Sequence, residues 1–247
     1  MTRALRAALL VAVIFAAWQL LFLYAGSGAL TSPLDTIMHT AQLLSSRSFY
    51  PHLAETAQAF AVALAIAISC GILIGFTLGL YRFASDVAEP VLVALYSIPK
   101  ITLYPIVLLA FGIGMPAKIA FGAIHGIIPV AIFALGAVRN LNPVYLKAAR
   151  VMRMGPSRIA TRVLLPAAIP EIFTGIRIGF SLTLIGTLLG EMFASQRGLG
   201  FLLIQAIGLH NIRLIMALTL LLVVIAVTAS AALLAIDRRL RRHMFGS

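Results

Sequence analysis

The chain has 247 residues, of which 62% are hydrophobic and only 11% are charged, about half the charge of a soluble domain. Six apolar runs are long enough to cross a bilayer, and the intervals between them, at most about 30 residues, leave no room for a soluble catalytic domain. We therefore predict an all-α polytopic membrane protein whose residues 1–247 form one transmembrane domain. The predicted spans are 7–25, 54–80, 88–112, 118–138, 167–193 and 212–236.

The net charge of +12 follows this topology. With both termini in the cytoplasm, most of the Lys and Arg residues face the cytoplasm, whereas Arg47, Lys118, Arg197 and Arg213 face the outside. The positive-inside rule predicts such a bias. The charge therefore indicates orientation in a membrane, and we expect no nucleic-acid partner.

The first span follows the basic start MTRALR, which a secretory signal peptide would share. Its apolar stretch is longer than the roughly 7–15-residue core of a signal peptide, which favours an uncleaved anchor. The small residues of YAGSGA keep cleavage as the alternative.

A short outer helix is expected at about 32–46. Ser32 suits the N-cap and Pro33 the first helical position, and apolar residues recur at helical spacing from Leu34 to Leu44. We expect this helix to lie in the plane of the membrane interface, with an ordinary loop as the alternative.

The second span carries Gly71, Gly75 and Gly79, spaced four residues apart. Such a stripe lets another helix approach closely, so it predicts a packing face. The alternative is that glycine is simply common in membrane helices.

The third span contains Pro90, Pro99 and Pro105, with Lys100 beside the second of them. Proline disturbs a helix, and an intramembrane lysine is costly unless it faces protein or a cavity. These residues predict a bent helix beside an internal pathway; the alternative is a kink with Lys100 paired for structure alone.

Polar residues in the fifth span, Arg177, Ser181 and Thr183, are further candidates for the path, with ordinary interhelical hydrogen bonds as the alternative. All seven acidic residues are expected in loops or near span ends, Glu191 near the outer end of this span. A carrier driven by protons or sodium would need carboxylates inside the membrane, so that mechanism is not indicated.

Catalytic and metal-binding patterns are missing from the sequence. No two histidines are three or four residues apart, and there is no G-x-x-x-x-G-K-[ST] loop. We expect no catalytic residue, metal or cofactor on this chain, which also argues against an intramembrane enzyme.

The cytoplasmic segment 140–166 is basic and holds no acid. Asn142 and Pro143 start a compact helix, the pair Gly155-Pro156 breaks it, and SRIATRVLL forms a second short helix that ends before Pro166. The element could lie on lipid headgroups, but its defined turn and its small Ala-Ala surface favour docking into a partner.

The run KAARVMRMGPSRIATRVLLP resembles the signature E-A-A-x3-G-x9-I-x-L-P of inner-membrane permeases of binding-protein-dependent ABC importers. Lys147 and Arg153 stand where that signature has glutamate and glycine, and we take the glycine to be displaced to Gly155. The matching positions are Ala148, Ala149, Leu165 and Pro166, with Val163 as a conservative replacement.

Two further stretches, SPLDTIMHTAQLL and SIPKITLYPIVLLAFGIGMPAK, are similar to the nitrate/sulfonate/taurine-type branch of these permeases. The resemblance implies a type I importer permease in the inner membrane, a second permease copy and surrounding lipids. It also implies two cytoplasmic ATPase subunits, which would bind ATP and Mg, and a periplasmic or lipid-anchored solute-binding protein. The solute is expected to be small and anionic.

On this resemblance the segment 142–166 couples the permease to the ATPase, and residues 237–247 form a cytoplasmic tail. The implied coupling residues are Lys147, Ala148, Ala149, Arg150, Arg153, Gly155, Val163, Leu165 and Pro166. Because Lys147 reverses a charge, the ATPase is expected to carry a compensating acid. The alternative function is a secondary carrier or channel that ATP does not drive.

Overall fold

The computed structural model describes residues 3–245, without the side chains at positions 3, 4, 7, 146, 150, 156, 194 and 240–245. Over these residues the chain is helical and contains no strand. Within residues 3–245, five helices are long and apolar enough to cross a membrane, and a sharply bent pair provides a sixth span if it is counted as one. The prediction of an all-α polytopic protein with about six spans is confirmed.

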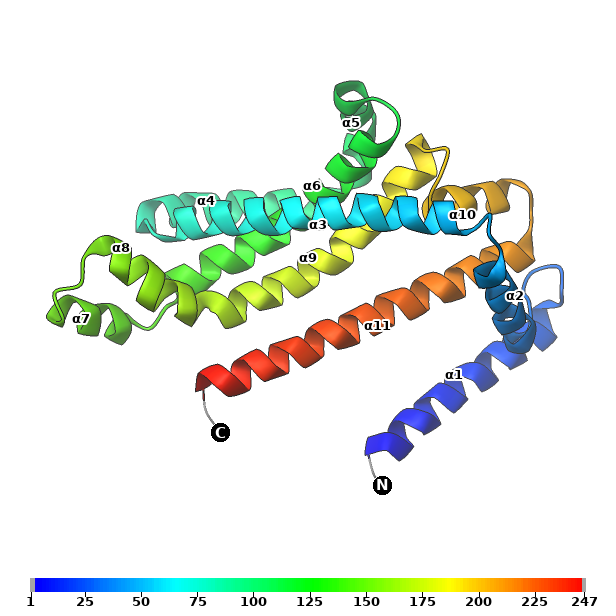
Figure 1. Ribbon diagram of the computed structural model, residues 1–247, viewed down its shortest axis with the longest axis horizontal. Helices are drawn as coiled ribbons and strands as arrows, with labels where there is room; N and C mark the ends of the chain where they lie inside the picture. The colour runs from blue at the N-terminus through cyan, green and yellow to red at the C-terminus, as the bar shows by residue number, and fades with distance from the viewer. Residues whose placement is uncertain (1–2, 246–247) are drawn as a thin grey trace.

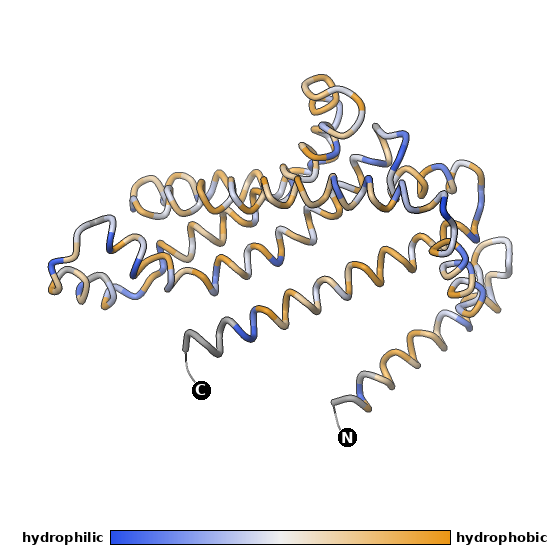
Figure 2. The backbone as a smooth tube through the Cα atoms, in the orientation of Figure 1, coloured by the Kyte–Doolittle hydropathy of each residue, from blue (hydrophilic) through white to orange (hydrophobic). Residues whose placement is uncertain are grey.

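The long helices are α1 (Arg3–Ala25), α3 (Tyr50–Gly79), α6 (Met115–Arg139), α9 (Leu165–Ala194) and α11 (Ile212–Phe245). Between them lie α2 (Pro33–Ser45), α4 (Arg82–Ser97), η1 (Lys100–Leu103), α5 (Tyr104–Phe111), α7 (Pro143–Val151), α8 (Pro156–Ile159), η2 (Ala160–Leu164) and α10 (Leu199–Gly208). Most residues along the long helices are hydrophobic, and polar segments gather at the two ends of the molecule (Figure 2).

The core consists of α3, α6 and α9, with α6 packed against both of the others (Figure 1). The α7–α8 element protrudes at one end, and α2 and α10 lie at the opposite end. Helix α1 stands apart from the core and is tied to the start of α2, where the indole Nε1 of Trp18 donates to the Thr31 carbonyl at 3.2 Å. The chain therefore has a buried three-helix centre between a basic end and an outer end.

The glycine stripe of α3 faces α6. A Cβ atom added at Gly71 would lie 2.6 Å from the Cβ of Val130, and one at Gly79 would lie 2.9 Å from the Cβ of Val138. Real Cβ atoms do not approach so closely, so the two backbones can pack at this distance only because these positions are glycine.

The third span is broken rather than curved. Helix α4 ends at Ser97, Ile98 is extended, and the chain continues into η1 and α5 at an angle of 86°. Pro99 stands at the break and Pro105 in the first turn of α5, while Pro90 is accommodated inside α4. The bend that the prolines predict is therefore concentrated at one point.

The predicted outer helix is present as α2. The Ser32 side chain accepts a hydrogen bond from the amide of Asp35 at 3.1 Å, and Pro33 occupies the first turn. At the other end of the chain, α11 continues to Phe245, so the segment expected as a tail is helical as far as that residue, and 246–247 lie outside the described residues.

Candidate functional site

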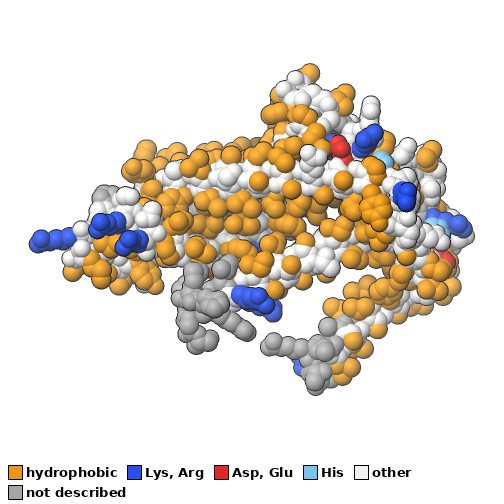
Figure 3. All heavy atoms as spheres, in the orientation of Figure 1, with side chains coloured by type: hydrophobic (Ala, Val, Ile, Leu, Met, Phe, Trp, Pro, Cys, Tyr) orange, Lys and Arg blue, Asp and Glu red, His pale blue; other side chains and the backbone are white. Residues whose placement is uncertain are grey.

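The α7–α8 element is a compact basic projection at one end of the molecule (Figures 1 and 3). Helix α7 begins as expected, because the side-chain oxygen of Asn142 accepts from the amide of Val144 at 3.0 Å and Pro143 is the first helical residue. The described basic side chains of the element and of the adjoining η2 are exposed: Lys147, Arg153, Arg158 and Arg162. The side chain of Arg150 lies outside the described part of the chain.

The turn after α7 is built around Arg153, which has φ of 52°. The amide of Met154 donates to the carbonyl of Ala149 at 3.1 Å, the bond that closes a Schellman turn whose left-handed residue is usually glycine. Gly155 has no left-handed φ, and an added Cβ there would meet nothing within 4 Å. The left-handed residue of this turn is therefore Arg153, which stands where the signature has glycine, and the displacement of that glycine to Gly155 stays a prediction.

The expected Ala-Ala surface is wrong. Ala148 is exposed, but Ala149 is only 2% exposed and packs inside the chain. The reason is helical geometry: neighbouring positions are about 100° apart around a helix, so Ala148 and Ala149 point in different directions. Only Ala148 of this pair is available to a partner.

The second short helix does not end before Pro166. Helix α8 runs through the π-helical turn η2 directly into α9, with the Leu165 amide bonded to the Ala160 carbonyl. Proline lacks an amide hydrogen and its ring crowds the preceding turn, and the wider π turn accommodates both effects. Val163 is half-buried, and Leu165 and Pro166 are exposed at the start of α9. Residues 156–194, from α8 through the fifth span, thus form one continuous helical rod.

The polar residues of the fifth span are not gathered around one cavity. Thr183 is fully buried, and its hydroxyl packs against Gly126 of α6 without a hydrogen-bond partner among the described residues. Ser181 is exposed, and Arg177 lies 3.8 Å from a carboxylate oxygen of Asp237 on α11. At Thr183 the geometry is that of helix packing.

Lys100 lies at the break in the third span and is only 9% exposed. Its Nζ atom donates to the Tyr96 carbonyl at 3.0 Å and lies 5.2 Å from the centre of the Tyr96 ring. The last carbonyls of α4 have no helical partner, so the ammonium caps this helix end and stabilises its dipole. Two of its three N–H groups remain for other acceptors.

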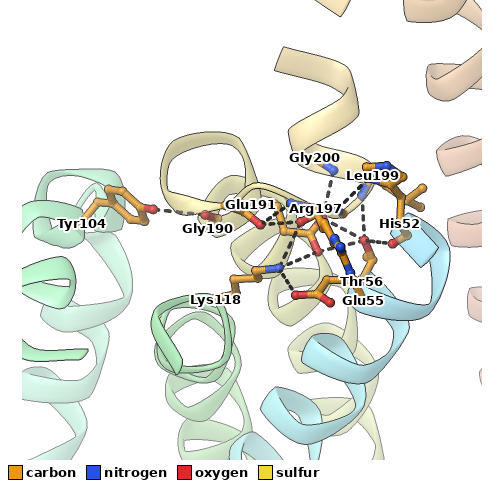
Figure 4. A network of polar contacts seen from close by, with 12 residues as sticks. His52, Glu55, Thr56, Tyr104, Lys118, Gly190, Glu191, Arg197, Leu199 and Gly200 are labelled. Carbon is orange, nitrogen blue, oxygen red and sulfur yellow. Dashed lines mark hydrogen bonds and ion pairs between the residues drawn. The ribbon is translucent and has the colours of Figure 1, made fainter. Parts of the chain in front are cut away.

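A buried polar network joins α3, α6, α9 and the loop before α10 (Figure 4). The carboxylate of Glu191 is fully buried and accepts from the Thr56 hydroxyl at 2.8 and 2.9 Å and from the Gly200 amide at 2.9 Å. The Thr56 oxygen in turn accepts from the amide of Leu199 at 2.8 Å. The loop after α9 is therefore folded down onto this carboxylate.

Lys118 supplies the positive charge of the network. Its buried Nζ atom lies 2.9 Å from a carboxylate oxygen of Glu55 and 4.0 Å from one of Glu191, and it donates to the Arg197 carbonyl at 3.1 Å. Gly198, with φ of 125°, lets the loop pass close to Glu191.

The sequence interpretation missed this network. It placed Lys118 among the residues that face the outside and Glu191 near a span end, and neither side chain is exposed. The available signal was the Gly198-Leu199-Gly200 run shortly after Glu191, because glycine often marks a place where backbone approaches another group closely.

The fold defines a polytopic membrane protein with a basic projection at one end. Residues 67–245 match the family described as binding-protein-dependent transport system inner membrane component, and the chain belongs to this family. It is a permease subunit of an ABC importer, of the branch that includes taurine, nitrate and sulfonate permeases.

Three relatives illustrate the similarity. A probable ABC transporter permease protein of Haemophilus influenzae is 29% identical, with 91% of each chain covered. The taurine transport system permease protein TauC of Escherichia coli is 30% identical over 78% of this chain and 70% of its own. The nitrate import permease protein NrtB of Synechocystis is 30% identical over 83% of this chain and 77% of its own.

A solved structure shares the fold. A chain of the MetNI methionine ABC transporter in inward-facing conformations superposes with a TM-score of 0.57 and 24% identity, covering 77% of this chain and 93% of that one. The expected type I importer fold is in accord with this match. The chain therefore has the fold of a multi-pass membrane protein. Its family consists of transport subunits rather than enzymes.

Proposed function

We propose that this permease is driven by a separate ATPase that docks on the segment 142–166. Two copies of the chain would line the path, two ATPase subunits would bind ATP and Mg, and an external solute-binding protein would deliver the solute in the inner membrane. Alternating access would follow from ATP-driven movement of the two coupling segments.

The observation that carries the proposal is the rigid connection between the basic projection and the core. Helix α8 continues through η2 into α9 without a loop, and α9 packs along α6. A force on the exposed α7–α8 element would therefore be transmitted to the buried centre of the bundle. The exposed Lys147 would meet an acidic residue of the ATPase.

We infer that the solute is a small anion. Relatives are described as permeases for nitrate, taurine, aliphatic sulfonates and bicarbonate, most of which are anions. Lys100, at the break of the third span, supplies positive charge within a predicted span, whereas Arg177 is already within ion-pair distance of Asp237. Both features favour an anion over a cation in the path.

The test is the substitution Gly155→Trp. Gly155 is exposed and a Cβ atom added there would meet nothing within 4 Å, so we expect the chain itself to accept tryptophan. We expect the ATPase subunit to be lost from the purified complex and ATP-driven uptake to stop. Gly28→Trp is the matched control for purification, because a Cβ atom added at Gly28, in the loop between α1 and α2, would also meet nothing within 4 Å. Retention of the ATPase by Gly155→Trp, or uptake by this chain without ATP, would contradict the proposal.

A further inference from the structure

Three consecutive backbone amides hold the loop between α9 and α10 against the core (Figure 4). The amide of Gly198 donates to Nδ1 of His52 at 3.2 Å, and the amide of Leu199 donates to the Thr56 hydroxyl oxygen at 2.8 Å. The next amide donates to the buried carboxylate of Glu191 at 2.9 Å. We call the three acceptor side chains and these amides the outer clasp. It lies at the end of the molecule opposite α7 and α8 (Figure 1).

The bond to His52 exists only while its imidazole is neutral. A backbone amide can donate only to a ring nitrogen that has a free lone pair, and Nδ1 loses that lone pair when it binds a proton. An imidazole changes its charge between about pH 5 and 8, whereas a hydroxyl such as that of Thr56 does not titrate in this range. His52 is half-buried rather than enclosed, so water can bring a proton to it.

The groups around His52 do not attract a second positive charge. Two acids are near it, Glu55 one turn along α3 and Glu191 on α9, and Lys118 of α6 lies within ion-pair distance of both. Arg197, in the loop itself, is exposed and basic, so the acids are matched in number by bases. Helix α10 carries no charged residue, and α11 packs here through leucines.

The N-terminus of α10 opposes protonation of the ring directly. Gly198 is the N-cap of α10, and its amide points at Nδ1 of His52. The positive end of a helix dipole disfavours a cation placed there. The ring of Phe201 stacks on the imidazole with centroids 6.1 Å apart and planes 3° apart, which fixes its orientation without adding a charge.

We propose that the outer clasp is a proton-sensitive switch, in which a proton bound at Nδ1 of His52 releases the loop from α3. The protonated nitrogen presents a hydrogen to the Gly198 amide hydrogen, so an attraction becomes a repulsion. Because the held loop requires a neutral ring, its stability is complete in neutral and alkaline medium and is lost as the pH falls through the range in which a free imidazole titrates.

Release of the loop would change the core beneath it. The Arg197 carbonyl accepts from Nζ of Lys118 at 3.1 Å, so the loop covers the buried ion cluster. The same loop begins where α9 ends, and the clasp therefore fixes the outer end of the helical rod 156–194. Acid outside the membrane would admit water to the cluster and free that end of the rod. This inference does not depend on the proposed coupling to an ATPase.

The test measures hydrogen exchange over residues 197–200 in the full chain, held in lipid nanodiscs at pH 7.5 and 5.5. Rates are corrected for the intrinsic effect of pH on exchange. A free imidazole is half-protonated at about pH 6.5, so the ratio of released to held loop should rise about tenfold at pH 5.5. The protection of the Gly198 and Leu199 amides should fall by the same factor.

Two variants of His52 separate its proton from its hydrogen bond. Asparagine has a side-chain oxygen as many bonds from the backbone as Nδ1, and it does not titrate. His52→Asn should therefore keep its pH 7.5 protection at pH 5.5, and it also controls for titration of Glu55 and Glu191. His52→Phe keeps a ring to stack on Phe201 but has no acceptor, so its protection should be low at both pH values.

His210→Asn is the matched control, because it removes another histidine at the outer end from a turn with φ of 53°, which asparagine tolerates. It should respond to pH like the wild type. Equal wild-type protection at the two pH values would overturn the inference, as would a pH response that His52→Asn retains or His210→Asn loses. If His52→Asn does not fold, equal protection of His52→Phe and the wild type at pH 7.5 would still overturn it. Each of these failures leaves the proposed function intact.

Discussion

The ammonium of Lys118 lies 2.9 Å from the carboxylate of Glu55, and the lysine side chain is almost completely buried. The pair joins α6 to α3 at the outer end of the core, 4.0 Å from the buried carboxylate of Glu191 on α9. One cation thus lies within ion-pair distance of two carboxylates contributed by two other helices. A buried ion cluster of this kind depends on all its members, because removal of one leaves a charge without compensation.

Lys118→Met should therefore destabilise the protein strongly. It removes the positive charge beside Glu191, and breaking a buried pair in this way costs roughly 3–5 kcal/mol of unfolding free energy. The measurement is thermal unfolding of the purified chain in mild detergent. Adding Glu191→Gln to the lysine variant should recover part of the loss, since a neutral side chain is less costly to bury. Equal stability of Lys118→Met and the wild type would show that the cluster contributes nothing to the fold.

The sequence allowed the spans and the helix starts to be predicted, but not this cluster. Apolar length and proline position are local properties, so α2 after Ser32 and α7 after Asn142 could be anticipated. The burial of Lys118 and Glu191 arises only when α3, α6 and α9 pack together. A count of charges along the chain places both at span ends, where exposure to water is the ordinary expectation.

The outline of the segment 142–166 was predictable, but some of its structural details were not, for a similar reason. Its basic residues and the helix break at Gly155-Pro156 can be recognised in the sequence. The conformation of Arg153, in contrast, depends on the turn in which the Met154 amide bonds to the Ala149 carbonyl. The packing of Thr183 could not be predicted either, because the sequence does not show that Gly126 of α6 lies against its hydroxyl.

Arg153→Gly should stabilise the turn after α7. A left-handed conformation costs an L-residue roughly 1–2 kcal/mol, and glycine avoids most of that cost. Hydrogen exchange at the Met154 amide of the assembled transporter should slow about fivefold or more. Arg158→Gly, at a helical position of α8, is the control and should speed local exchange. Faster exchange in Arg153→Gly would mean that the arginine side chain, rather than the backbone, holds the turn.

Gly75→Ala should disrupt the contact between α3 and α6. The added Cβ would lie 2.7 Å from the Cβ of Ala134 and 2.9 Å from the amide nitrogen of Leu135, so the helices must separate. Overpacking of this kind costs about 1–3 kcal/mol, more where backbone is in the way. Size-exclusion chromatography and thermal unfolding should show less folded protein. Gly28→Ala, with nothing within 4 Å, should leave both measurements unchanged.

Lys100→Met tests whether the break in the third span serves transport or only the fold. Methionine keeps the apolar stem and removes the charge, and Lys100→Arg keeps the charge as the matched control. If the ammonium attracts an anion, uptake of labelled nitrate or taurine by proteoliposomes that hold the complete transporter should fall at least about tenfold in the methionine variant, which corresponds to 1.4 kcal/mol of lost interaction. The ATPase should still co-purify, because α7 and α8 are untouched. The arginine variant should keep most of the uptake.

If methionine instead lowers the thermal stability and leaves uptake normal, Lys100 acts only as the cap of α4, since its bond to the Tyr96 carbonyl already accounts for that role.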